Sequence, residues 1–148
     1  YRFSKLVGPA GMVYSMDTKQ QHIDFLNEFI NINHITNITP ITSKIDDICL
    51  DKKADYAFMC SLYHIIYGVS SEPQRSALIT SIKKGLKPGG KFVIVDNGPV
   101  ADNQLPYHGP YITREMIIFQ LAYYGFELES YEQIIPQRYM LTFKWNGN

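Results

Sequence analysis

The chain has 148 residues, with 14 basic and 14 acidic side chains and therefore no net charge, and 45% of it is hydrophobic. This length predicts one domain with a buried core. Scattered, balanced charges argue against a nucleic-acid footprint or a polybasic membrane patch, and no apolar run approaches the ~18–20 residues of a membrane span. Cys49 and Cys60 lack metal-ligand spacing and suggest no disulfide framework. We therefore expect a reducing, cytoplasmic setting.

The first 62 residues alternate between helical and strand patterns. The chain opens without an initiator methionine or a signal-peptide pattern, so we expect it to begin partway through a domain. Apolar spacing and breakers predict, in order, the tail of a helix over 1–7, a strand over 12–16 that ends at Asp17, a helix over 21–32, a strand over 38–41 and a strand over 54–62. Pro40 cannot donate to a ladder, so its strand belongs at an edge.

The stretch KKGLKPGGKFVIVD, residues 83–96, links a helix to a strand. The helix over 72–86 must end before Pro88, and Pro88 to Gly90 are typical of a tight turn. Phe92 to Val95 form an apolar run, which is typical of a strand buried between helical layers. Asp96 and Asn97 end that run. The segment predicts a helix–turn–strand unit of an α/β fold.

The last third of the chain predicts one helix and two strands. Thr113 can cap the helix, and Gly125 suits the position just after it. Residues 126–135 and 138–145 then alternate as two strands joined by a turn at Pro136 and Gln137. Alternating helices and strands upstream favour a parallel sheet with helices on both faces, closed by this antiparallel hairpin.

Ligands of open parallel sheets bind beyond the carboxyl ends of the strands. Polar residues that follow the predicted strands are therefore candidate site residues. Asp17 is the most informative, because an acidic residue at the end of the second strand can accept hydrogen bonds from ribose hydroxyls. A helix-capping Asp is the structural alternative. The glycine-rich loop that precedes such an acid by roughly 20 residues would lie just before residue 1.

Four segments in order, VGPAGMVYSMD, ADYAFMCSLYHI, LITSIKKGLKPGGKFVIVD and REMIIFQLAYYGFEL, resemble class I S-adenosylmethionine-dependent methyltransferases. The resemblance extends from Lys5 to Trp145. It implies a three-layer α/β/α Rossmann-like sheet, mostly parallel, in the order 3-2-1-4-5-7-6 with strand 7 antiparallel. The family's first strand and glycine-rich loop have no counterpart in the chain. We therefore expect residues 1–148 to be a single methyltransferase-like domain that is incomplete at its N-terminus.

The resemblance also implies a site for S-adenosylmethionine. Asp17 would bind the ribose, with Thr18 and Lys19 beside it, and Cys60 and Ser61 would line the methionine portion. The loop over 43–46 would hold the adenine. Lys44 occupies the position where the family frequently has a carboxylate, so either Asp46 takes that acidic role or the role is absent. Ile45 can bind the adenine through its backbone.

Methyl transfer needs a base only when the acceptor is a weakly nucleophilic oxygen or a protonated nitrogen. His64 is the candidate base, with a structural histidine at a helix start as the alternative. The candidate substrate contacts, for which loop packing is the alternative, are Tyr63, Tyr67, His108 and Tyr111. Asp46 and Asp47 lack further ligands, so we expect no metal site.

The resulting hypothesis is methyl transfer from S-adenosylmethionine to a small-molecule acceptor, with no nucleic-acid or membrane partner. A methyltransferase-like domain used for binding or assembly is one alternative. A nicotinamide-dependent oxidoreductase is another, although the LKPGG turn and the terminal hairpin weigh against it. The sequence does not identify the methyl acceptor. It leaves the oligomeric state open, with a homo-oligomer among the alternatives.

Overall fold

The computed structural model describes residues 1–99 and 110–147, and it divides into two compact units, Tyr1–Leu50 and Asp51–Asn148. The expectation of a single domain stays a prediction. Among the described residues, no helix is long and apolar enough to cross a membrane.

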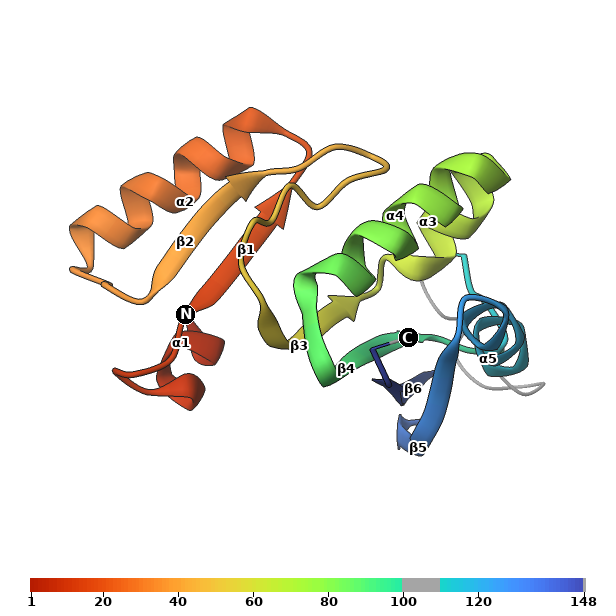
Figure 1. The fold of residues 1–148 in the computed structure, drawn as a ribbon. Coiled ribbons are helices and arrows are strands. Elements are labelled where there is room, and N and C mark those ends of the chain that lie inside the picture. Colours follow the sequence, from red (N-terminus) through yellow and green to blue (C-terminus); the bar gives the residue numbers. More distant parts are fainter. Residues whose placement is uncertain (100–109, 148) are drawn as a thin grey trace. The chain divides into compact units, whose positions relative to one another are not determined.

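The first unit pairs strands β1 (Val13–Asp17) and β2 (Ile38–Thr42) with helices α1 (Arg2–Val7) and α2 (Gln20–Ile32) (Figure 1). The strands are parallel, with Asp17 opposite Thr42, and in the described residues β2 pairs with β1 alone. Pro40 therefore lies in an edge strand, as predicted. The side chain of Asn37 donates to the carbonyls of Ser4 and Gly8, which fastens the end of α1 to the start of β2.

The second unit is a four-stranded sheet with three helices. Its elements are β3 (Ala54–Cys60), α3 (Tyr63–Val69), α4 (Glu72–Gly85), β4 (Leu86–Asn97), α5 (Arg114–Tyr123), β5 (Phe126–Ile135) and β6 (Arg138–Trp145). The strand order is β3-β4-β6-β5, with β3 and β4 parallel and β6 antiparallel to both neighbours. The predicted terminal hairpin is confirmed, including its bounds.

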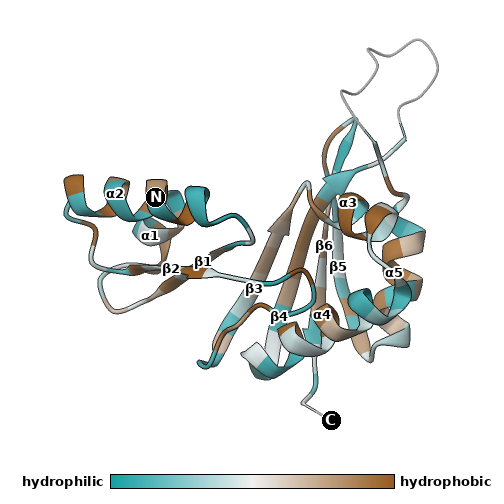
Figure 2. Ribbon diagram, turned by 90° about the horizontal axis from the view of Figure 1, so that it is seen from above, coloured by the Kyte–Doolittle hydropathy of each residue, from teal (hydrophilic) through white to brown (hydrophobic). Residues whose placement is uncertain are grey.

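The core of the second unit lies between the sheet and its three helices, which share one face of it (Figures 1 and 2). Phe92 is paired with Phe143, and Ile94 with Leu141. All four side chains are buried. Because successive strand residues point to opposite faces, this alternation puts the largest apolar side chains under the helices. The next pair in the same row is Asp96 with Tyr139, which carries the helix-facing side of the sheet to a polar end.

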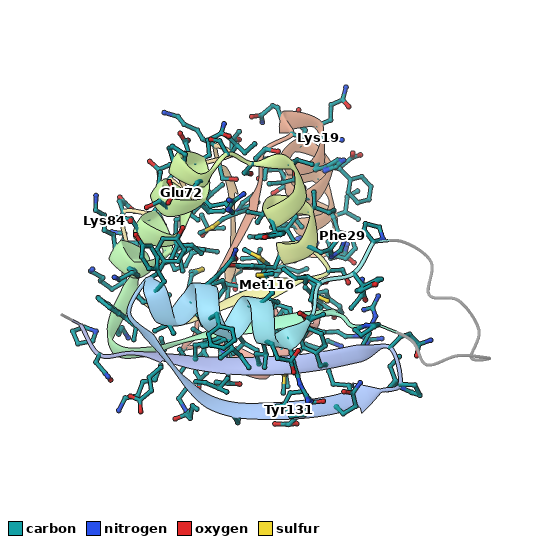
Figure 3. All side chains as sticks on the ribbon, turned by 90° about the vertical axis from the view of Figure 1, so that its right-hand side faces the viewer. Lys19, Phe29, Glu72, Lys84, Met116 and Tyr131 are labelled. Carbon is teal, nitrogen blue, oxygen red and sulfur yellow. The ribbon has the colours of Figure 1, made fainter. Side chains whose placement is uncertain are left out.

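Helix α4 is well specified at both ends. Ser71 and Gln74 form a reciprocal capping box, and Pro73 lies in the first turn, where its missing N–H costs nothing. Glu72 at the start and Lys84 at the end, both labelled in Figure 3, oppose the helix dipole favourably.

Three local expectations are corrected. Pro88 to Gly90 do not form a separate turn: strand β4 begins at Leu86, and the ladder with β3 has an irregularity there, with Gly89 at a φ of 76°. Thr113 precedes α5 but makes no side-chain capping bond. Residues 63–68, where the sequence offered a helix start at His64 only as an alternative, belong to α3. Contacts of this segment with β4 and α5 stabilise it, and local patterns do not report such contacts.

Candidate functional site

The polar end of the second unit's sheet is built by β3 and β4, which end side by side. Cys60 pairs with Val95, and the Ser61 N–H donates to the Val95 carbonyl at 2.8 Å. Asp96 is the next residue of β4, and α3 begins at Tyr63 directly after β3. Parallel strands that end at one edge bring their following residues together, so the first turn of α3 lies against the end of β4.

His64 and Asp96 form a buried pair at this edge. His64 Nδ1 lies 2.6 Å from Asp96 Oδ1, and the His64 backbone N–H donates to Asp96 Oδ2 at 3.1 Å. The Asn97 N–H also donates to Asp96 Oδ1, at 2.7 Å. The Asp96 side chain is 0% exposed and that of His64 is 7% exposed. Two backbone N–H donors and the imidazole ring thus converge on one buried carboxylate, which fixes the imidazole against β4.

Ser61 occupies an unusual backbone conformation between these two elements. Its φ is 51°, in the left-handed region that non-glycine residues seldom adopt. The Cys60 thiol and the Ser61 hydroxyl are 3.9 Å apart. A strained residue at a strand end turns the chain sharply into α3 and is found preferentially at functional sites. The predicted contacts of Cys60 and Ser61 with a cofactor stay predictions.

The aromatic candidates have different environments. Tyr63 is 2% exposed, and its hydroxyl donates to Gln120 Oε1 at 2.8 Å, so it packs α3 against α5. Burial raises the pKa of Tyr63, and neighbouring Tyr124 adds to the shift. The guanidinium carbon of Arg75 lies over the Tyr67 ring, 5.1 Å from its centroid. Tyr111 is 58% exposed. His108 lies outside the described residues.

Tyr139 closes the same edge from β6. Its hydroxyl donates to the Ile112 carbonyl at 2.7 Å, and its backbone pairs with that of Asp96. Burial raises the pKa of Tyr139, and the charge of Asp96 raises it further. A cavity of about 210 Å³ opens beside it, lined in part by Gly98, Arg114 and Tyr131.

A larger cavity, of about 300 Å³, lies at the opposite end of β4, beside Leu86 and Pro88. Three lysines line it, but Lys53 donates to the Lys84 carbonyl and Lys83 donates to the Tyr124 carbonyl. Two of the three lysine ammonium groups therefore already bind backbone carbonyls of the protein. Its position, away from the carboxyl ends of the strands, further argues against it as the site.

The first unit has its own polar edge, at Asp17. Asp17 Oδ1 accepts from the Lys19 N–H at 2.8 Å, and Oδ2 lies 2.8 Å from His22 Nδ1. These two hydrogen bonds, that of Lys19 first, hold the pKa of Asp17 below its usual value. The side chain is 39% exposed. Each carboxylate oxygen has a second lone pair, so the group fits a pair of ribose hydroxyls.

The loop after β2 starts beside Asp17, because the Ser43 N–H donates to the Asp17 carbonyl at 2.9 Å. It then turns back on itself: the Lys44 N–H donates to the Asp47 carbonyl, and Asp47 Oδ1 accepts from the Cys49 N–H. Lys44 and Ile45 are exposed, and Asp46 is half-buried. The structure thus joins Asp17, Thr18 and Lys19 to the 43–46 loop within one unit. Their contacts with a cofactor stay predictions.

Asp96 is the residue that sequence reasoning undervalued. The sequence placed it at a strand end but gave it no partner, since the pairing with His64 joins residues 32 positions apart. The usable signal was a buried strand ending in an acid, with a histidine just after the neighbouring strand. Among the described residues, no group of three or more metal-ligating side chains is close enough to hold an ion.

The family model described as "Tellurite resistance protein TehB" matches residues 4–137 of the chain. That span contains Asp17, His64 and Asp96, together with every site residue predicted from the sequence. No curated protein sequence matches.

Solved structures share the fold. A SAM-dependent methyltransferase from Aquifex aeolicus superposes with a TM-score of 0.80 at 21% identity, covering 97% of this chain and 73% of that one. The glycopeptide N-methyltransferase MtfA, complexed with S-adenosyl-L-methionine, gives 0.73 at 13% identity, covering 95% and 74%. TehB from Haemophilus influenzae gives 0.61 at 16% identity, covering 90% and 49%, so the chain spans about half of that protein. The predicted Rossmann-like methyltransferase fold is confirmed.

Proposed function

Because the chain belongs to the TehB family and has the fold of class I methyltransferases, we propose that it transfers the methyl group of S-adenosylmethionine to a small-molecule acceptor. When bound, the sulfonium cofactor supplies an activated methyl group for in-line displacement. The protein's part is then to bind the nucleoside, orient the acceptor and exclude water.

On the cofactor side, the proposal depends on Asp17 as the residue that binds the ribose. It is a partly exposed acid with a lowered pKa at the carboxyl end of β1, so at neutral pH it can only accept hydrogen bonds. Ribose hydroxyls are donors of the matching kind. The loop that begins at Ser43 lies beside it and supplies the surface for the adenine through Lys44, Ile45 and Asp46.

His64 carries the acceptor side, because it lies at the carboxyl ends of β3 and β4 with a buried carboxylate at Nδ1. Cys60 and Ser61 precede it at the same edge and line the methionine portion in this proposal. Tyr67 and Tyr111 are accessible enough to contact an acceptor. Tyr63 supports α3 through its bond to Gln120.

Calorimetric titration with S-adenosylhomocysteine tests this function, with NADH as the competing ligand. We expect the first to bind and the second not to bind. Asp17→Asn should weaken binding about 10- to 100-fold, since charge-assisted hydrogen bonds contribute ~1.5–3 kcal/mol each. Asp24→Asn is the matched control, because Asp24 is an acid of the same unit whose Oδ1 accepts from Gln20 Nε2.

Three results would contradict the proposal. Binding of NADH alone would favour an oxidoreductase. Equal affinity of the wild type and Asp17→Asn would remove the ribose assignment. Binding of S-adenosylhomocysteine without transfer to any small acceptor would favour a domain used for binding or assembly.

A further inference from the structure

The pairing of His64 with Asp96 determines which ring nitrogen is free. An ionised carboxylate only accepts hydrogen bonds, so the nitrogen that faces it at 2.6 Å, Nδ1, carries the proton. In a neutral ring the other nitrogen, Nε2, then has a free lone pair. Nε2 makes no hydrogen bond with any residue in the described part of the chain.

The position of Asp96 holds this arrangement in place. Its Oδ1 is fixed by the Asn97 N–H and its Oδ2 by the His64 N–H, so the carboxylate cannot rotate away without losing both. His64 in turn lies in the first turn of α3, which Tyr63 fastens to α5 through Gln120. A buried acid that orients the ring and can stabilise the imidazolium favours proton abstraction by a histidine.

We propose that Asp96 is a positioning residue that holds His64 as the Nδ1–H tautomer, so that Nε2 removes the proton from an acceptor whose nucleophilic atom is still protonated. The acceptor class is then a hydroxyl or an ammonium group. This inference rests on the proposed methyl transfer.

The acceptor's O–H or N–H proton goes to Nε2, its lone pair forms the bond to the methyl carbon, and the carbon–sulfur bond breaks with its electrons left on sulfur. His64 becomes an imidazolium, which Asp96 stabilises, and returns the proton to water. An acceptor that is already an oxyanion, such as tellurite, or a thiolate needs no such base.

The charges of four groups packed around the pair do not change in the pH range where a histidine titrates. Tyr139 on β6 and Tyr63 on α3 have raised pKa values, so both remain neutral. Glu115 on α5 acts on Tyr139, and Arg114 holds the pKa of Glu115 below its usual value. Arg75 on α4 acts on Tyr63 and keeps its charge.

The first arm of the test needs no variant. Long-range ¹H–¹⁵N NMR of the purified wild-type protein reports the tautomer of each ring, with exposed His34 as the internal reference. We expect the proton of His64 on Nδ1. A proton on Nε2 in the neutral ring would overturn the positioning role, whatever the protein methylates.

The second arm measures methyl transfer from labelled S-adenosylmethionine to phenols, alcohols, amines, a thiol and tellurite. His64→Gln should lower kcat about 100-fold or more with protonated acceptors. Asp96→Asn should lower kcat by a similar factor with KM nearly unchanged, because the new Asn amide can donate to His64 Nδ1 and so invert the tautomer. Phenol turnover by both variants should recover toward pH 10, where phenols ionise. His34→Asn, at a φ of 52° that Asn tolerates, is the control.

The outcomes separate the two proposals. If the wild type does not bind S-adenosylhomocysteine, the methyltransferase function is refuted. The NMR result would still decide the role of Asp96. Transfer only to the thiol or tellurite, no transfer to any acceptor, or a His64→Gln variant as fast as wild type would overturn the acceptor class. A pH profile of Asp96→Asn identical to that of wild type would leave Asp96 a purely structural residue.

Discussion

Tyr63 donates its hydroxyl proton to Gln120 Oε1 at 2.8 Å and thereby joins α3 to α5 across 57 residues of sequence. Tyr63 is 2% exposed. The bond matters for the site because His64 is the next residue of α3. Rigid support of this kind is what keeps a catalytic side chain in one geometry.

Tyr63→Phe should therefore destabilise the protein by about 1–2 kcal/mol, since it removes a part-buried hydrogen bond and leaves the Gln120 amide oxygen without its donor. Urea unfolding at pH 7 measures the loss. Tyr123→Phe is the control, because Tyr123 is 81% exposed and its change should stay within about 0.5 kcal/mol. Equal unfolding midpoints for wild type and Tyr63→Phe would show that the contact contributes nothing.

Stability should fall at alkaline pH. The pKa values of Tyr63 and Tyr139 are raised in the folded state, so their contribution is complete below the unfolded value of about 10 and is lost as pH rises above it. The limiting slope is about 1.4 kcal/mol per pH unit for each tyrosine. Urea unfolding between pH 8 and pH 11 measures it. Tyr63→Phe should reduce the slope, and an unchanged slope would exclude Tyr63 as a contributor.

Ser61 should tolerate glycine but not a branched side chain. Its φ of 51° suits glycine, so Ser61→Gly should be neutral or stabilising by up to about 1 kcal/mol. Ser61→Val should cost about 1–3 kcal/mol, because a β-branched residue is strained there. Thermal unfolding of the two variants compares them. A valine variant as stable as the glycine variant would argue against backbone strain at the end of β3.

The two helix starts provide a matched pair of caps. Ser71 Oγ accepts from the Gln74 N–H, whereas Thr113 before α5 makes no such bond. Ser71→Ala should cost about 1 kcal/mol, and Thr113→Ala should cost much less. Chemical denaturation of both variants tests the contrast. Equal losses would mean that the cap of α4 is no stronger than that of α5.

The local elements were readable from the sequence because each has its own signal. The alternation of Tyr139, Leu141 and Phe143 predicted β6, and the apolar spacing from Ile23 to Ile30 predicted α2. The same reading failed at Pro88 to Gly90, where the ladder with β3 continues the strand through a turn-like sequence. It also passed over α3, which is only seven residues long and depends on Tyr63 packing against α5.

The sequence by itself determined the order of the elements other than α3, the terminal hairpin and the candidate residues at the strand ends, because periodicity and breakers act over a few positions. Only the tertiary structure paired His64 with Asp96 and buried Tyr63 against Gln120. Those pairs join residues 32 and 57 positions apart, and no local pattern records which side chain a strand end will meet. The physical reason is that the register of β3 against β4 and the packing of α3 decide those encounters.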